Sequence, residues 1–163
     1  MTPIFLCGFM GCGKSTVGKV VADITGRAFI DLDEYIEEAA SMSIPEIFEK
    51  YGEKHFRALE TEALKVLGNS FTVIATGGGA LLSPQNVCIA SSTGLVIFID
   101  TPFDLCYDRI KDDPHRPIAA SSTKEELKAR FDERYVKYKK NSALCVSGEG
   151  TPEQIARRIL EIV

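Results

Sequence analysis

The fold of this chain is decided by a short stretch near its start, GFMGCGKST at positions 8–16. It satisfies the pattern G-x-x-x-x-G-K-[ST], and it lies between an apolar run at 4–7 and an amphipathic segment at 16–24. Between a strand and a helix, such glycines let backbone N–H groups and the helix N-terminus face a phosphate group. The stretch therefore predicts a loop that holds the phosphates of a nucleoside triphosphate.

The side chains of this loop have separate predicted tasks. Lys14 adds a positive charge at the phosphates, and the Ser15 hydroxyl can bind Mg²⁺. The predicted nucleotide contacts are Gly11, Cys12, Gly13, Lys14, Ser15 and Thr16. Cys12 also has a second interpretation, because a thiol at a helix N-terminus beside a lysine is often reactive. The plainer interpretation is that it fills the place of a small residue.

Composition limits the kinds of partner that the protein can have. The chain has 163 residues, of which 45% are hydrophobic and 26% charged, and its formal net charge is −4. These values are typical of one soluble domain, which we expect to span residues 1–163. The acidic balance argues against nucleic acid or a membrane surface as the partner. The cysteines are scattered and odd in number, which favours a reducing cytoplasmic location over a disulfide framework or a zinc site.

Short apolar runs alternate with longer amphipathic segments along the chain. Strands are expected at 4–7, 29–32, 72–75, 95–99 and 144–147. Capping boxes that begin at Ser43, Thr123 and Thr151 mark helix starts, and Thr101 followed by Pro102 resembles a cap with proline at the first helical position. The alternation predicts the α/β class, as a three-layer αβα fold with a five-stranded parallel sheet and the site at the carboxyl ends of its strands.

Two aspartates follow the second expected strand. Asp31 and Asp33 are two positions apart, so in extended backbone both side chains would point toward the phosphate loop. One carboxylate can hold Mg²⁺ together with Ser15, while the other orients and deprotonates a substrate hydroxyl. The plainer alternative makes Asp33 a helix N-cap and Asp31 a solvated strand end. The nearby phosphate loop favours the first interpretation.

Further features of interest lie later in the chain. Arg57 and Glu60 are spaced to share one face of a helix, so the glutamate can fix the guanidinium, although such pairs are more often surface ion pairs. The glycines at 77–79 follow the third strand, either as bare backbone against a ligand or as a plain flexible turn. The polar segment 111–123 is the longest loop-like stretch and is a predicted lid that carries Arg116.

In this order the motifs resemble the shikimate kinase family over essentially the whole chain. They are GxxGxGKST, DxD after the second strand, FRxxE, GGG after the third strand, RP in the lid, and an arginine, Arg134, ahead of Tyr138. The resemblance implies a phosphate-loop fold like that of the nucleoside monophosphate kinases. It also implies transfer of the ATP γ-phosphoryl group to the 3-hydroxyl of shikimate, in the biosynthesis of aromatic amino acids.

The resemblance assigns a role to each motif residue. Asp33 would take the hydroxyls, and Asp33, Lys14 and Arg116 would be the catalytic residues. Asp33, Arg57, Arg134, Gly77, Gly78 and Gly79 would bind shikimate, Ser15 and Asp31 would serve Mg²⁺, Arg109 would pack near the adenine and Arg116 would reach the phosphates. We expect a monomer whose partners are shikimate and ATP, with no nucleic acid and no membrane.

Two rival functions differ from this one in testable ways. A kinase for another small molecule, such as gluconate, would not need the DxD, FRxxE and GGG motifs together. A GTPase-like switch or nucleotide-binding module would carry an N-K-x-D motif for guanine, which the sequence lacks. Both alternatives are less compatible with the motif set than a shikimate kinase.

Overall fold

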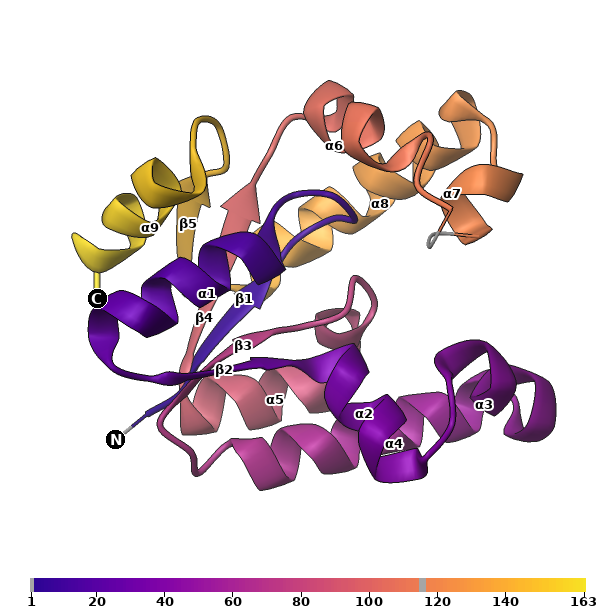
Figure 1. Ribbon diagram of the computed structural model, residues 1–163, viewed down its shortest axis with the longest axis horizontal. Helices are drawn as coiled ribbons and strands as arrows, with labels where there is room; N and C mark the ends of the chain where they lie inside the picture. Colours follow the sequence, from indigo (N-terminus) through magenta and orange to yellow (C-terminus); the bar gives the residue numbers. More distant parts are fainter. Residues whose placement is uncertain (1, 115–116) are drawn as a thin grey trace.

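The computed structural model describes residues 2–114 and 117–163 and contains one parallel sheet (Figure 1). Its strands are β1 Ile4–Cys7, β2 Ala28–Asp31, β3 Thr72–Ala75, β4 Leu95–Asp100 and β5 Leu144–Ser147. They are hydrogen-bonded in the order β2-β3-β1-β4-β5, and all neighbouring pairs are parallel. The predicted five-stranded parallel sheet is confirmed, with β2 shifted by one residue and β4 longer by one.

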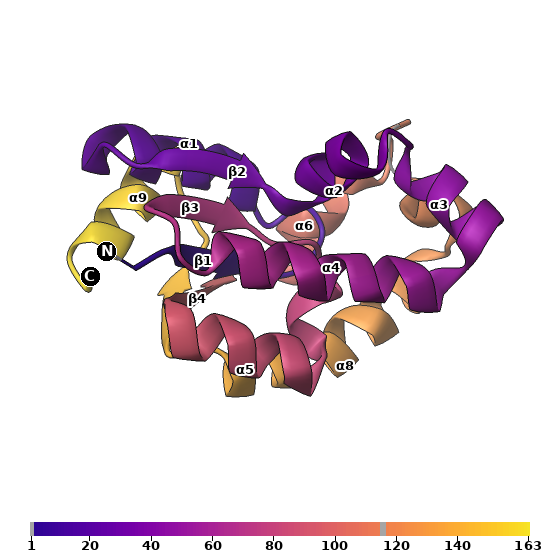
Figure 2. The same ribbon diagram turned by 90° about the horizontal axis from the view of Figure 1, so that it is seen from below.

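Helices connect the strands and cover both faces of the sheet. They are α1 Lys14–Thr25, α2 Leu32–Ala40, α3 Ile44–Tyr51, α4 Glu53–Leu67, α5 Pro84–Thr93, α6 Phe103–Ile110, α7 Pro117–Ser121, α8 Lys124–Asn141 and α9 Pro152–Leu160, with a short 3₁₀ helix at Ala80–Leu82. Figure 2 shows α1 and α9 on one face and α4, α5 and α8 on the other. The three-layer αβα prediction is therefore confirmed.

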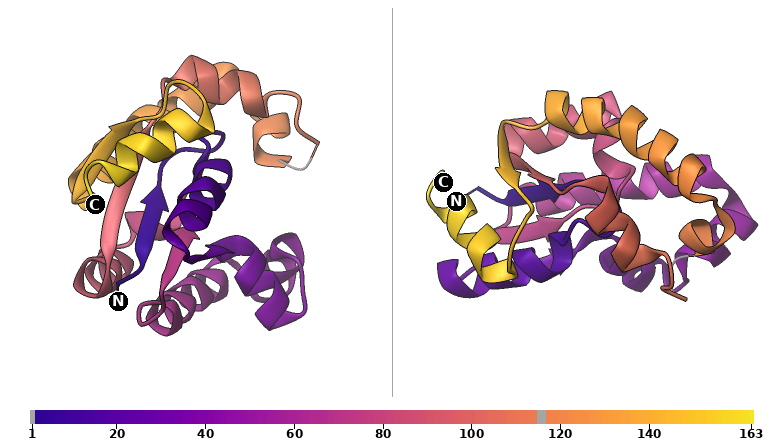
Figure 3. Two further views of the ribbon diagram at one scale, coloured as in Figure 1. Left: turned by 60° about the vertical axis from the view of Figure 1, so that its left-hand side comes forward. Right: turned by 90° about the horizontal axis from the view of Figure 1, so that it is seen from above.

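The central strands β1, β3 and β4 are mostly apolar because both of their faces are covered. Every residue of β1 and β3 is buried, whereas the edge strands β2 and β5 are partly exposed. This rigid centre fixes where the strand ends lie. Beyond those ends, α2 and α3 extend on one side and α6 and α7 on the other (Figure 3).

Most of the predicted helix caps are present. Ser43 and Thr151 form complete capping boxes, and the Thr123 hydroxyl accepts a hydrogen bond from the Glu126 N–H group. The prediction for Thr101 was wrong: α6 begins at Phe103 with Pro102 as its N-cap residue, and no side chain caps it. The Thr101 hydroxyl instead donates to the carbonyl oxygen of Cys12 at 3.0 Å, which ties the end of β4 to the phosphate loop.

Among the described residues, no helix combines the length and the apolar character that crossing a membrane would require.

Candidate active site

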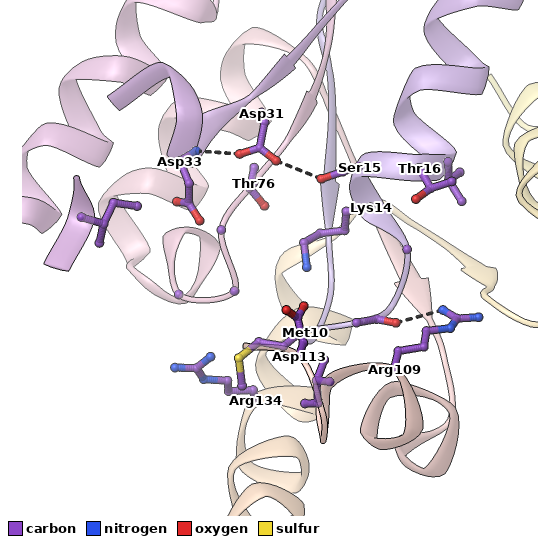
Figure 4. Close-up of a pocket in the computed structure, with 18 of the residues that line it drawn as sticks. Met10, Lys14, Ser15, Thr16, Asp31, Asp33, Thr76, Arg109, Asp113 and Arg134 are labelled. Carbon is purple, nitrogen blue, oxygen red and sulfur yellow. Dashed lines mark hydrogen bonds between the residues drawn. The ribbon is translucent and has the colours of Figure 1, made fainter. Parts of the chain in front are cut away.

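A cavity of about 1010 Å³ lies at the carboxyl ends of the strands (Figure 4). Most of the predicted site residues line it, namely Gly11, Gly13, Lys14, Ser15, Thr16, Asp31, Asp33, Arg57, Gly77, Gly78, Gly79, Arg109 and Arg134. These residues come from segments far apart in the sequence, and the parallel sheet brings them to one edge. The phosphate loop and the predicted acceptor residues therefore share a single cavity.

The phosphate loop has the backbone shape that its glycines predict. Gly11 and Gly13 have φ angles of +77° and +99°, and Gly13 is the residue from which α1 begins. Side chains other than glycine rarely adopt this left-handed region. Lys14 Nζ donates to the carbonyl oxygens of Gly8 at 2.7 Å and Phe9 at 3.1 Å, so its charge is held over the loop. The loop thus presents a cation and a helix N-terminus to the cavity.

Asp31 and Ser15 place two oxygen ligands side by side. Ser15 Oγ donates to Asp31 Oδ2 at 2.9 Å, and Asp31 Oδ1 accepts from the N–H groups of Asp33 and Glu34. Asp31 is therefore the N-cap of α2, which corrects both earlier expectations: Asp33 is not on extended backbone, and it is not the cap. The strand ends one residue earlier than predicted, and the cap fixes the direction of the Asp31 carboxylate.

The pair formed by Asp31 and Ser15 fits Mg²⁺. No group of three His, Cys, Asp or Glu side chains at metal-binding spacing occurs in residues 2–114 and 117–163. Mg²⁺ does not need such a cage, because it keeps several waters and takes one or two carboxylates together with phosphate oxygens. One carboxylate and one hydroxyl beside the phosphate loop are the donor set that such an ion requires from the protein.

Asp33 lies in the first turn of α2 with its carboxylate inside the cavity. Burial raises the pKa of Asp33, and the negative charge of Asp31 raises it further, while Lys14 and Arg57 act in the opposite direction. A carboxylate with a raised pKa is a stronger proton acceptor than an ordinary one. Asp33 therefore presents to the cavity a carboxylate whose pKa is raised.

Arg57 is oriented by a buried partner on the same helix. Its Nη1 lies 2.8 Å from Glu60 Oε2, and the Glu60 side chain is only 1% exposed. Burial raises the pKa of Glu60, although the Arg57 cation lowers it. The second acidic neighbour, Glu53, is exposed and lies at 3.4 Å. The interpretation as a fixed guanidinium is confirmed, and the alternative of a surface ion pair is wrong.

Each glycine at positions 77–79 leaves room for a charged side chain. A Cβ atom at Gly77 would lie 2.8 Å from Asp33 Oδ1, one at Gly78 would lie 3.2 Å from Arg134 Nη1, and one at Gly79 would lie 2.6 Å from Arg57 Nη1. None of these glycines has a positive φ angle. Glycine at these positions therefore leaves space. Without Cβ atoms there, Asp33, Arg57 and Arg134 can reach the cavity wall.

A family model described as SKI, shikimate kinase, matches residues 10–163 of this chain. The shikimate kinase of Staphylococcus aureus strain JH9 is 45% identical over 137 residues, which cover 84% of this chain and 79% of the relative. This chain belongs to the shikimate kinase family. It is therefore an enzyme of a kinase family.

Solved shikimate kinases share the fold. The shikimate kinase from Acinetobacter baumannii, determined in complex with shikimate, matches with a TM-score of 0.92 and 34% identity over 99% of this chain and 92% of that one. The shikimate kinase from Aquifex aeolicus matches with a TM-score of 0.85 and 40% identity over 98% and 94%. The phosphate-loop kinase fold expected from the sequence is confirmed.

The predicted arginines lie on different elements of this chain. Arg109 Nη1 donates to the carbonyl oxygen of Gly11 at 2.9 Å, and Arg134 faces Gly78 from α8. Arg116 lies outside the described residues, so its predicted contact with the phosphates stays a prediction. The predicted lid at 111–123 includes the short helix α7 within it, and its closure also stays a prediction.

Cys12 does not line the cavity, unlike the other residues predicted for the phosphate loop. Its side chain is 1% exposed, and its N–H group donates to the carbonyl oxygen of Phe9 at 3.1 Å. The expected role in nucleotide contact is not supported by this geometry, because both the side chain and the N–H group face the protein. The interpretation of Cys12 as a small, space-filling residue agrees with its burial.

An apolar wall of the cavity was not predicted. Met10, Ile44, Phe48 and Phe56 line it, and the two phenylalanine rings lie 5.0 Å apart. The amphipathic pattern of α3 indicated a buried face but not that this face would border a cavity. Phe56 is the phenylalanine of the FRxxE motif. Its position directly before Arg57 was the sequence feature that could have indicated a place beside the site. Such a wall suits the carbon face of a small ring.

Proposed function

We propose that this shikimate kinase transfers the γ-phosphoryl group of ATP to the 3-hydroxyl of shikimate, a step in the biosynthesis of aromatic amino acids. The observation that carries the proposal is the grouping of Asp33, Arg57 and Arg134 around the three glycines, in the same cavity as the phosphate loop. Guanidinium groups suit the carboxylate of such an acceptor, and a carboxylate with a raised pKa suits the proton of its hydroxyl. The relative from A. baumannii, which was solved with shikimate, supports this choice of acceptor.

The acceptor side binds and orients shikimate. Arg57 and Arg134 hold its carboxylate, because guanidinium groups pair with carboxylates through parallel hydrogen bonds. Glu60 keeps Arg57 in place, so little side-chain freedom is lost on binding. The ring lies against the backbone at 77–79 and the apolar wall. The 3-hydroxyl is thereby directed toward Asp33 and the phosphate loop.

The transfer step needs a base and charge neutralisation. Asp33 accepts the proton of the 3-hydroxyl, whose oxygen forms the new bond to the γ-phosphorus while the bond to the β–γ bridging oxygen breaks and ADP leaves. Lys14 neutralises charge on the phosphate oxygens. Mg²⁺, held by Ser15 and Asp31, supplies further charge neutralisation when bound. Arg116 adds its charge when the lid at 111–123 closes, and Arg109 packs near the adenine.

We further expect a single-domain monomer. A reducing cytoplasm suits an enzyme whose Cys88 and Cys145 are exposed and unpaired. The proposed cofactor and partners are thus limited to Mg²⁺, ATP and shikimate.

A panel of acceptors tests the proposal. ADP release is measured with ATP and Mg²⁺ in the presence of shikimate, quinate, gluconate or no acceptor. We expect turnover with shikimate alone, and phosphorus NMR of the product should show a phosphate monoester. Equal turnover with gluconate would contradict the acceptor assignment. ADP release that is independent of any acceptor would instead indicate an ATPase or a switch.

A further inference from the structure

The loop that carries the three glycines is held by side chains of other elements. Tyr138 Oη donates to the carbonyl oxygen of Gly78, Asn86 Nδ2 to that of Ala80 at 2.9 Å, and Asn141 Nδ2 to that of Leu81 at 2.9 Å. Glycine offers no side chain to pack, so a glycine run has little else to restrain it. These donors therefore define the path of the backbone against which the acceptor is proposed to lie.

Two of these donors lie on α8 together with Arg134. Arg134, Tyr138 and Asn141 are spaced by four and three positions, which places them on one face of the helix. This face of α8 lies beside the glycine loop, because Tyr138 and Asn141 donate to the carbonyl oxygens of Gly78 and Leu81. A single helix thus carries one of the charged groups proposed to bind the acceptor and two of the groups that shape the backbone beside it.

The hydroxyl of Tyr138 is placed by the core rather than by the loop. The side chain is 2% exposed, and its ring packs on Phe98 of β4 with centroids 5.5 Å apart. A buried aromatic side chain in such a contact has little freedom to move. The hydroxyl is therefore a fixed point against which softer groups can be aligned.

Arg134 and Tyr138 meet at the same glycine. A Cβ atom at Gly78 would lie 3.2 Å from Arg134 Nη1 and 3.6 Å from Tyr138 Oη. Burial raises the pKa of Tyr138, while the neighbouring Arg134 cation lowers it. The phenol thus donates to the loop carbonyl and lies close to the guanidinium at the same glycine.

We propose that Tyr138 is a positioning residue for the acceptor: its hydroxyl aligns the Gly78 carbonyl and the Arg134 guanidinium so that a carboxylate can be received. The inference rests on the proposed function, since it concerns how that acceptor is bound. Tyr138 itself does not touch the reacting atoms. It acts through Arg134 and through the backbone of the loop, and it should therefore influence acceptor binding without influencing nucleotide binding.

The test compares two tyrosines on the same helix. Tyr138→Phe removes the hydroxyl at the loop, whereas Tyr135→Phe removes a hydroxyl that donates to Asp100 Oδ2 at 3.0 Å. Both rings pack on Phe98, with centroids 5.5 and 5.7 Å from it, so each variant keeps a ring on the same neighbour and loses only its hydroxyl. Tyr138 is buried, whereas Tyr135 is partly exposed. We expect Tyr138→Phe to raise the KM for shikimate about tenfold, the loss typical of one hydrogen bond to a charged or buried partner. The KM for ATP should not change, and kcat should change little.

A general loosening of the fold predicts a different pattern. Equal increases in KM for both substrates, or the same increase in Tyr135→Phe, would overturn the inference. Hydrogen exchange of the amides at 77–82 is measured without substrate in both variants and should be faster only in Tyr138→Phe. Unchanged exchange there would also overturn the inference. Absence of turnover with shikimate in the unmodified enzyme would contradict the proposed function instead, which the exchange data alone do not test.

Discussion

The two glycine clusters of this protein resemble each other in sequence, but Gly13 and Gly79 show two different physical reasons for a glycine. Gly11 of the phosphate loop combines both reasons, with a φ angle of +77° and a Cβ position 2.8 Å from Ile110 Cγ2. Gly13 in the phosphate loop has a φ angle of +99°, yet a Cβ atom there would meet nothing closer than 3.7 Å. Gly79 has ordinary angles, φ −102° and ψ −11°, yet a Cβ atom there would lie 2.6 Å from Arg57 Nη1. Gly13 has room for a side chain but the wrong backbone, and Gly79 has a permitted backbone but no room.

This difference shows how each cluster serves its ligand. In the phosphate loop the glycines shape the backbone, because backbone N–H groups are the binding groups. In the loop at 77–79 they make way for Asp33, Arg57 and Arg134, the charged side chains that we propose bind the acceptor. Substitutions should therefore separate the two halves of the cavity, with nucleotide effects from one cluster and acceptor effects from the other.

The largest effect is expected at Asp33, the proposed base in the part of the cavity that is proposed to bind the acceptor. Asp33→Asn should lower kcat by about 10²- to 10⁴-fold, because the amide accepts a hydrogen bond but not a proton. ATP binding, measured by calorimetry, should be retained because the phosphate loop is intact. A variant with more than about a tenth of the normal kcat would show that Asp33 is not the base.

The same substitution should also change the pH dependence and the stability. The pKa of Asp33 is raised by burial and by Asp31, so kcat/KM of the unmodified enzyme should fall as the pH is lowered through that raised pKa. The folded protein binds this proton more tightly than the unfolded chain, so stability falls as the pH rises through the folded-state pKa. Asp33→Asn should therefore increase the Tm at neutral pH. An unchanged or lower Tm would contradict the cost assigned to the buried charge.

The next largest effect is expected at Gly79, which leaves space for the Arg57 side chain. Gly79→Ala forces the Arg57 guanidinium to move, because an alanine Cβ would lie 2.6 Å from its Nη1. We expect the KM for shikimate to rise by about tenfold or more, the loss of one charge-assisted hydrogen bond. The KM for ATP should change little, whereas the Tm should fall, because the buried Glu60 loses its ion pair with Arg57. Gly78→Ala, where the nearest contact is 3.2 Å, is the matched control with a smaller expected effect.

Gly13→Ala sharpens the comparison from the other side. The alanine has room but must hold a left-handed backbone, which costs about 1–2 kcal/mol. We expect a lower free energy of unfolding by about this amount, measured with urea, and a higher KM for ATP. The KM for shikimate should stay the same. If Gly13→Ala and Gly79→Ala affected both substrates alike, the two clusters would not have separate roles.

Local patterns in the sequence predicted much of this structure. The buried strands were recognisable because a parallel sheet that is covered on both faces needs continuous apolar runs, as in Ile4–Cys7 and Thr72–Ala75. The phosphate loop was recognisable because its chemistry lies in consecutive residues. The capping boxes at Ser43 and Thr151 were equally local. These features depend on neighbours in the chain and hardly on tertiary structure.

Features that depend on distant residues were predicted less well. The hydroxyl of Thr101 bonds to Cys12 across the fold, so its cap-like sequence was misleading. Glu60 is buried only because α4 packs against other elements, which an i,i+3 spacing does not reveal. The reason for three successive glycines came from side chains on α2, α4 and α8. Asp31 is the N-cap of α2 because β2 ends one residue earlier than the apolar pattern suggested.

The smallest effect is expected at Cys12. Here a glycine of the phosphate loop, Gly8, leaves space for a side chain, as the glycines at 77–79 do. A Cβ atom at Gly8 would lie 2.6 Å from Cys12 Sγ, so the thiol occupies the room that this glycine leaves. Cys12 is 1% exposed, and burial raises the pKa of its buried neighbours Cys7 and Cys106 to about 12. A thiol reagent should therefore modify the exposed Cys88 and Cys145 without loss of activity.

The assay follows thiol modification and ADP release together, with and without bound ATP. The control variant carries both Cys88→Ser and Cys145→Ser, which removes the exposed thiols. We expect this variant to react slowly and to remain active, because a reagent reaches Cys12 only if the loop moves off its side chain. Rapid inactivation that ATP prevents, and that Cys12→Ser abolishes, would mean that the phosphate loop opens readily. In that case the shape of the phosphate loop would depend on the bound nucleotide. The contrast between this loop and the loop at 77–79 would then hold only in the complex with ATP.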